Sequence, residues 1–363
     1  MIYYIEIVFI VCLCCACTLF KKGIAWTKVF AILIFGATWL VLALRGSSVG
    51  ADTQSYINYF WMIDEMSIPD LIGKINSPNR ELMDVGFAIY VKVLSFLTNS
   101  PQIMLAISGG FYLYVVYIFA KYNKLVNPIY VLWYICLAPY LTAFNLVRQC
   151  VALGFCLLSW MKYNENKRKA YFLWIIAVLF HISAVVWAIT FVAKKIKPSR
   201  KLFVAVFGLL VVLFFWGGKI IYYVLSFFPV YQYRYGQNGV YSDMTTQANG
   251  VVFLWIIIVL CAALVAFKTN WGQCLDSLKF EKIVYSLIAI AFFMLGNRIG
   301  GVQRIAVYFQ PFWVPLLCDF GKMYEKKVEL LYTIAVTVCA VAFFFLQIQS
   351  DQYSPYVFFW NNI

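Results

Sequence analysis

Runs of about 20 mostly apolar residues recur along the chain and alternate with short polar or basic segments. A helix of that length crosses about 30 Å of hydrocarbon, so each run is a candidate membrane span. A transmembrane β-barrel would show shorter alternating segments, and a cleaved signal peptide would not be followed by further spans. The pattern predicts an all-α, polytopic membrane helical bundle, in one domain over residues 1–363, with full spans near 2–20, 27–44, 101–120, 127–143, 145–161, 202–222, 250–267, 283–297, 302–318 and 328–348.

The placement of two further apolar stretches, 85–98 and 170–193, depends on the basic clusters. Cytoplasmic loops are rich in Lys and Arg, and putting the clusters of this chain inside places the N-terminus outside. Residues 170–193 must then enter and leave on one side, as two half-helices that meet near His181, and 85–98 dips in from outside. We prefer these ten spans plus two half-spanning elements over twelve full spans, which would move two basic clusters outside.

The outer face then carries the two sizeable loops, 45–84 and 223–249, and the function should lie there. Composition agrees with a membrane protein, because 64% of the residues are hydrophobic and 12% are charged, against about 45–50% and about 25% in soluble domains. The formal charge of +14 comes from short clusters between spans and does not indicate a nucleic-acid partner. Most of the 11 cysteines lie in apolar runs, so we expect no disulfide framework, metal site or cofactor.

The first candidate segment runs from Arg45 to Tyr56 with the sequence Arg-Gly-Ser-Ser-Val-Gly-Ala-Asp-Thr-Gln-Ser-Tyr. Arg45 and Asp52 offer a charge pair at the membrane boundary. The simpler interpretation is an interfacial anchor, in which Arg45 snorkels and Asp52 caps a helix beginning near Thr53. The other acidic residues of this loop, which lack the DxD spacing of a metal site, are Asp64, Glu65, Asp70, Glu81 and Asp84.

Two further positions bring a charge or a titratable ring into apolar sequence. Arg148, followed by Gln149, opens an almost wholly apolar span, where a guanidinium needs a counter-ion, a polar cavity or a snorkelling path. His181 lies in the middle of the 170–193 stretch. It could fill a bundle core with both ring nitrogens paired, or act as acid, base or donor in a polar cavity at the break.

The last candidates lie late in the chain. Arg298 and Arg304, with glycines between them, could clamp phosphate oxygens, or the segment could be a short polar turn. The 231–249 segment is rich in Tyr, Gln, Asn and Gly, which suit either sugar binding or interfacial anchoring.

At these motifs the sequence resembles the EpsG/Wzy-type family of bacterial polysaccharide polymerases. The resemblance rests on an ordered set of short motifs: Arg45-Gly46, Val49-Gly50 and Asp52-Thr53 with Tyr56; Gly86-Phe87; Arg148-Gln149 with Ala152; Phe180-His181-Ile182-Ser183-Ala184; and Arg304 with Tyr308-Phe309.

This resemblance implies a GT-C-like, metal-independent glycosyltransferase in the bacterial cytoplasmic (inner) membrane, with its active face external. It would polymerise undecaprenyl-diphosphate-linked oligosaccharide repeats into exopolysaccharide, capsule or O-antigen, with the lipid-linked substrate, membrane lipids and a chain-length regulator as partners. Catalytic roles fall to Arg148, which would neutralise charge on the diphosphate, and to Asp52 or His181 as the base. The implied substrate-binding residues are Arg45, Arg298, Arg304, Tyr56, Gln149 and Tyr308.

Three alternatives stay open at this point. An O-antigen-ligase-like glycan transferase would use much the same arginines. A polysaccharide transporter or flippase could line its path with intramembrane Arg and His. In a membrane O-acyltransferase His181 would be catalytic, but the external arginines would have no obvious purpose.

Overall fold

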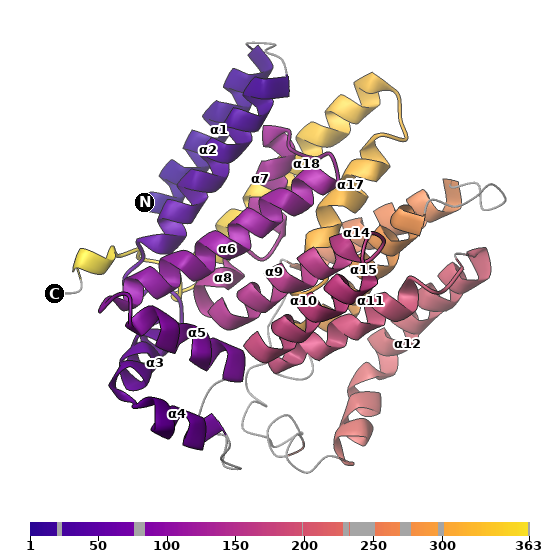
Figure 1. Cartoon of the computed structure of the whole chain (residues 1–363). Helices are drawn as coiled ribbons and strands as arrows, with labels where there is room; N and C mark the ends of the chain where they lie inside the picture. The colour runs from indigo at the N-terminus through magenta and orange to yellow at the C-terminus, as the bar shows by residue number, and fades with distance from the viewer. Residues whose placement is uncertain are drawn as a thin grey trace. The chain divides into compact units, whose positions relative to one another are not determined.

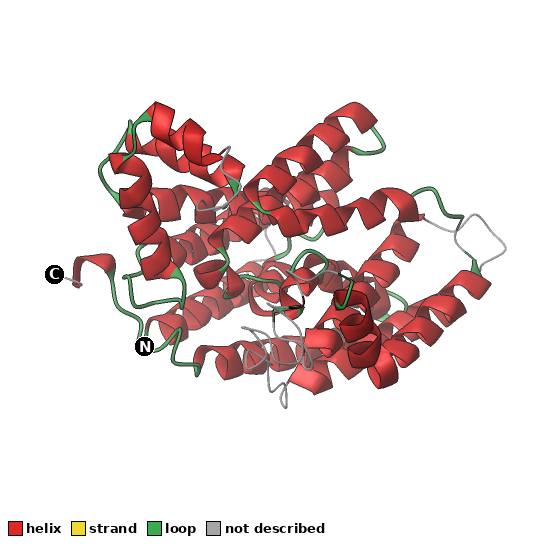
Figure 2. Cartoon of the chain, turned by 90° about the horizontal axis from the view of Figure 1, so that it is seen from below, coloured by secondary structure: helices red, strands yellow, loops and turns green. Residues whose placement is uncertain are grey.

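The computed structural model describes residues 1–19, 24–75, 84–197, 199–227, 232, 251–268, 277–296 and 301–361. This part of the chain consists of helices joined by loops and contains no β-strand, which confirms the predicted all-α fold (Figures 1 and 2). The elements are α1 Ile2–Leu19, α2 Ile24–Ala43, α3 Thr53–Glu65, α4 Ile68–Ile75, α5 Val85–Ser95, α6 Pro101–Tyr122, α7 Pro128–Leu137, α8 Thr142–Asn145, α9 Val147–Lys162, α10 Lys167–Phe180, η1 Ile182–Trp187, α11 Ala188–Ala193, α12 Arg200–Leu225, α14 Val251–Lys268, α15 Ser277–Gly296, α16 Gln303–Ala306, η2 Gln310–Phe312, α17 Trp313–Gly321, α18 Lys326–Ile348 and η3 Phe359–Asn361.

The chain divides into two compact units. The first comprises Met1–Trp187 together with Ala340–Ile363, and the second comprises Ala188–Cys339. Within the first unit, α9 packs against α6 and α10, α2 packs against α6, and α1 packs against α2. In the second unit α15 packs against α12, α14 and α17.

Several helices have the length and surface of membrane spans. By length and composition, three described helices could cross a membrane: Trp26–Ala43, Pro101–Tyr122 and Lys326–Ile348. Large apolar side chains such as Ile32, Leu33 and Val338 are exposed on their surfaces, as expected where lipid rather than water is the solvent. These helices agree with a polytopic membrane protein, while the number of spans and their orientation stay predictions.

Two of the predicted spans are not continuous helices. In the stretch 127–143, α7 ends at Leu137, and Ala138 adopts an extended conformation with ψ 174° because it precedes Pro139. The stretch 302–318 is divided into α16, η2 and α17 around Pro311. The prediction of one uninterrupted helix in each stretch is therefore wrong, because proline interrupts the pattern locally.

Both proposed half-spanning stretches contain short helices. The first, 85–98, holds α5 with 11 residues, and the second holds α10, η1 and α11. Helix α10 ends at Phe180, and His181 is extended, with φ −158° and ψ 118°. The break at His181 is thus confirmed, whereas the entry and exit of this segment on one side of the membrane stays a prediction.

A buried lysine joins α5 to α3. The ammonium group of Lys92 donates to three carbonyls at the end of α3, those of Ile63 (3.2 Å), Asp64 (3.0 Å) and Met66 (2.7 Å). A helix C-terminus has unpaired carbonyls and negative partial charge, so it suits a cation. Because α3 carries Tyr56 and α5 begins directly after Asp84, Lys92 fixes the elements that hold these two side chains.

Candidate functional site

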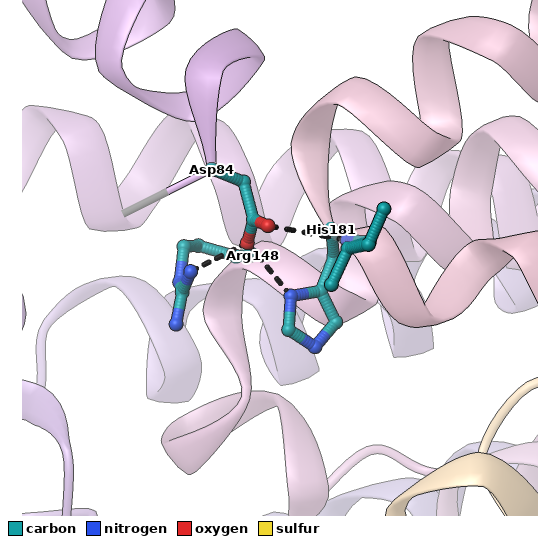
Figure 3. Close-up of polar contacts among 4 residues, drawn as sticks. Asp84, Arg148 and His181 are labelled. Carbon is teal, nitrogen blue, oxygen red and sulfur yellow. Dashed lines mark hydrogen bonds and ion pairs between the residues drawn. The ribbon is translucent and has the colours of Figure 1, made fainter. Parts of the chain in front are cut away.

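Asp84, Arg148 and His181 meet in the first unit, although they come from three separate segments (Figure 3). The Oδ2 atom of Asp84 accepts from Nη1 of Arg148 at 2.5 Å and lies 2.8 Å from Nδ1 of His181. All three side chains are partly exposed, at 16% for Asp84, 23% for Arg148 and 22% for His181. The cluster is therefore sheltered but open to a ligand.

Each member of the cluster stands at the end of a helix. Asp84 precedes α5, Arg148 lies in the first turn of α9, and His181 follows α10. Gly86 allows α5 to approach α10, because a Cβ atom at Gly86 would lie 2.9 Å from the backbone of Leu179. The Gly86-Phe87 motif thus has a steric role, which is to bring Asp84 within reach of His181.

The carboxylate of Asp84 has three hydrogen-bond partners. Besides Arg148 and His181, it accepts from the backbone amide of Ile182 at 3.2 Å through Oδ1, which ties it to the turn that follows His181. Burial by itself would raise the pKa of Asp84, but the hydrogen bond and charge of His181 and the charge of Arg148 outweigh it and lower this pKa. Asp84 is therefore an organising anion and a poor base.

The contact with Asp84 orients the ring of His181. With a carboxylate at Nδ1, the favoured neutral tautomer carries its proton on Nδ1 and leaves the lone pair on Nε2. In Figure 3 this second nitrogen faces away from Asp84. His181 can accept a proton there while Asp84 stabilises the resulting imidazolium, as a carboxylate does in hydrolytic triads.

Arg148 is held by Asp84 on one side and by the phenol of Tyr56 on the other. Burial raises the pKa of Tyr56, and the adjacent guanidinium opposes that rise. The Nε atom of Arg148 is buried without a hydrogen-bond partner among the described residues. Two protein side chains thus hold the guanidinium of Arg148, and the contact with Asp84 uses only one of its donor nitrogens.

Arg45, a predicted substrate-binding residue, is instead enclosed by protein. Its side chain is 1% exposed and donates to Thr53 Oγ1 (3.2 Å) and to the carbonyls of Leu42 (2.6 Å) and Phe144 (3.4 Å). The simple interpretation as a snorkelling residue is therefore wrong, and so is the predicted pairing with Asp52, because these internal acceptors occupy the guanidinium. Arg45 connects the first loop to the segment that precedes Arg148.

Gly50 of the first motif also has a structural role. Gly50 has φ +92°, and a Cβ there would lie 2.6 Å from the carbonyl oxygen of Phe144, so only glycine fits this turn. Asp52 lies next to α3, which begins at Thr53 as predicted, but its side chain makes no capping hydrogen bond. Gln149 is buried in α9 beside Arg148.

The late candidates belong to the second unit or lie outside the described residues. Arg304 is exposed at α16, one turn after Gly301, and Tyr308 is fully buried. Arg298 and nearly all of the 223–249 loop fall outside the described residues. The structure therefore brings together Arg148, His181 and Tyr56 of the predicted set.

Sequence reasoning missed two residues. Asp84 appeared only as one more acid in the first loop, although a charge directly before an apolar half-helix is itself a signal. The side-chain amide of Asn145 bonds to the first loop and to the C-terminal segment, and this short polar side chain gave no distinguishing pattern. Within the described ranges no group of three or more His, Cys, Asp or Glu could hold a metal ion.

Comparison with curated proteins and with solved structures gives no match. A family model, in contrast, matches residues 28–358, which include Arg45, Asp84, Arg148 and His181. Its description agrees with the resemblance seen in the motifs and indicates a membrane polysaccharide polymerase. The match covers most of the chain, and the protein therefore belongs to the EpsG family.

Proposed function

We propose that the protein is a glycosyltransferase that polymerises undecaprenyl-diphosphate-linked oligosaccharide repeats at the outer face of the bacterial cytoplasmic membrane. The observation that carries this proposal is the shared Asp84 carboxylate, which holds a cation, Arg148, and an imidazole, His181, at 2.5 and 2.8 Å. The polymer would be an exopolysaccharide, a capsule or an O-antigen. His181 and Arg148 match the two needs of the reaction, which are a base for a sugar hydroxyl and a positive charge for a leaving diphosphate.

In the proposed step, Nε2 of His181 takes the proton of an acceptor sugar hydroxyl, and the oxygen of that hydroxyl attacks the anomeric carbon of the donor. The new glycosidic C–O bond forms as the bond to the diphosphate breaks, and the lipid diphosphate leaves with the electron pair. Arg148 stabilises the negative charge that develops on the departing oxygens. Asp84 holds both groups in position and stabilises protonated His181.

The geometry favours His181 over Asp52 as the base. His181 has a carboxylate partner that fixes its tautomer, whereas Asp52 makes no side-chain hydrogen bond at α3. A cation in the form of Arg148 supplies the charge stabilisation, so the proposed step needs no metal ion. The predicted binding of phosphate oxygens by Arg304 and Arg298 stays a prediction.

The test is extension in vitro of a purified lipid-diphosphate-linked repeat by the protein in nanodiscs, with product length followed on gels. Wild type should make a ladder of products. Arg148→Ala and His181→Ala should lower the rate of product formation by a factor of about 10² or more. The matched control is Arg168→Ala, which removes an exposed arginine from α10.

The acceptor and a metal chelator give two further arms. A ladder that persists in EDTA supports metal independence. No ladder from the folded wild type with its cognate repeat would contradict the polymerase, and transfer only to a separate glycan acceptor would identify a ligase.

A further inference from the structure

An apolar stripe begins at the Asp84 cluster and runs along α5. Its members are Val85, Ile89 and Val93, which follow the four-residue spacing of one helix face and are 37%, 49% and 53% exposed. The opposite face of α5 packs against α3, and its Phe87, Val91 and Leu94 belong to a buried cluster that also holds Met104 and Leu105 of α6. The outward stripe is therefore separate from the protein core.

A second helix widens this surface where it meets the cluster. Leu179 of α10 touches Gly86 of α5, and both Leu179 and Ile182 present exposed apolar side chains on either side of His181. The aromatic ring of Phe180 packs on Tyr90 of α5, with the ring centroids 5.8 Å apart, which holds the two helices together. Exposed apolar side chains thus surround the polar cluster on the side of α5 and α10.

An amphiphilic ligand fits this arrangement of charge and apolar surface. The cation Arg148 suits an anionic diphosphate, whereas Val85, Ile89 and Val93 suit hydrocarbon. An 11-residue helix is about 16 Å long at 1.5 Å per residue, enough for several isoprene units. A diphosphate at Arg148 would leave its lipid chain next to this stripe.

We propose that the polyprenyl chain of a lipid diphosphate lies along Val85, Ile89 and Val93 of α5, with Leu179 and Ile182 beside its first units. This inference rests on the proposed function, since it places the lipid part of the same donor. The lipid enters sideways from the bilayer, and its diphosphate reaches Arg148 without the chain crossing water.

Photo-crosslinking tests the lipid site without requiring transfer. A benzophenone amino acid replaces Ile89, and the probe is alkyne-tagged undecaprenyl diphosphate in nanodiscs. The matched control is the same replacement at Ile32 of α2, which is 54% exposed against 49% for Ile89. Labelling at Ile89 should exceed that at Ile32 at least about fivefold, and excess untagged undecaprenyl diphosphate should suppress it while excess phospholipid does not.

The outcomes separate this inference from the proposed function. Equal labelling at the two positions, or no competition, in a protein that still polymerises would overturn the lipid site and leave the polymerase intact. Competed labelling at Ile89 in a protein that makes no ladder would support the lipid site and contradict the polymerase. A second readout is Ile89→Ser, which should raise KM for the lipid-linked donor several-fold with little change in kcat, whereas Ile32→Ser should leave both unchanged.

Discussion

The side-chain oxygen of Asn145 accepts a hydrogen bond from the backbone amide of Ala51 at 2.6 Å, across 94 residues of sequence. The amide nitrogen of Asn145 donates to Gln352 Oε1 at 2.7 Å and to the hydroxyl of Tyr353 at 3.2 Å. Asn145, at the end of α8, therefore joins the first loop and the C-terminal segment to the part of the chain directly before α9, which carries Arg148.

Other bonds hold the same C-terminal segment in place. The amide of Gly46 donates to the carbonyl of Val357 at 2.7 Å, and the amide of Gly50 donates to the carbonyl of Gln352 at 2.6 Å. This explains why the Arg45–Thr53 motif is rich in glycine, since its backbone must come close to two other segments. The motif bonds to Phe144 and Asn145 and so supports the segment that precedes Arg148.

Replacing Asn145 should weaken the fold and the site together. Asn145→Ala removes three hydrogen bonds, of which those to Gln352 and Tyr353 are partly buried, and should lower the free energy of unfolding by about 1–3 kcal/mol. Thermal unfolding in detergent measures this loss. Asn58→Ala is the control, because Asn58 is exposed and bonds to the side chain of Gln54. Equal melting temperatures of the two variants would show that the hydrogen bonds of Asn145 do not stabilise the fold.

Asp84→Asn should remove the charge that organises the cluster while keeping the size of the side chain. Without a carboxylate, the His181 tautomer and the Arg148 position are both released, and the polymerisation rate should fall about 10²–10⁴-fold. Product formation per minute in nanodiscs measures the effect. Asp70→Asn, at an exposed carboxylate of α4, should keep the wild-type rate. If Asp84→Asn were active while His181→Ala was inactive, catalysis would not depend on the orientation of His181 by Asp84.

The ion pairs of Asp84 predict a definite dependence of stability on pH. Burial by itself would raise the pKa of Asp84 in the folded protein. The hydrogen bond and charge of His181 and the charge of Arg148 outweigh burial, so this pKa is lowered. Its contribution is thus fully present above the ordinary carboxyl pKa and is lost as the pH falls through the lower, folded value. Melting curves of wild type and Asp84→Asn should converge in strong acid and separate above it. A constant difference across that range would contradict the pairing.

Arg45 should matter for stability before it matters for chemistry. Arg45→Met removes a buried donor from Thr53 Oγ1 and from the carbonyls of Leu42 and Phe144, and we expect a loss of at least about 2 kcal/mol. Arg45→Lys should be milder, because an ammonium group can serve some but not all of these acceptors. Quantitative unfolding in denaturant measures both, with Arg168→Met as the exposed control. Loss of activity in a normally stable Arg45→Met protein would instead return Arg45 to the substrate site.

The class of protein, the helical fold and the break at His181 could all be predicted from the sequence. The helical fold follows from a local property, since apolar runs of sufficient length must satisfy their backbone within a helix when lipid surrounds them. The break at His181 follows from the basic clusters on both sides of 170–193. The sequence also indicated Arg148 and His181, because a charge and an imidazole inside apolar segments are costly and therefore conspicuous.

How these residues are paired depends on tertiary packing, which the sequence did not reveal. The Asp84–Arg148 pair spans 64 positions and the Asp84–His181 pair spans 97, so no local pattern could place the carboxylate between them. The same holds for Arg45, whose acceptors come partly from Phe144 across 99 positions. A guanidinium at a membrane boundary is compatible with snorkelling, ligand binding or burial, and only the packing of distant carbonyls around it determines which of these occurs.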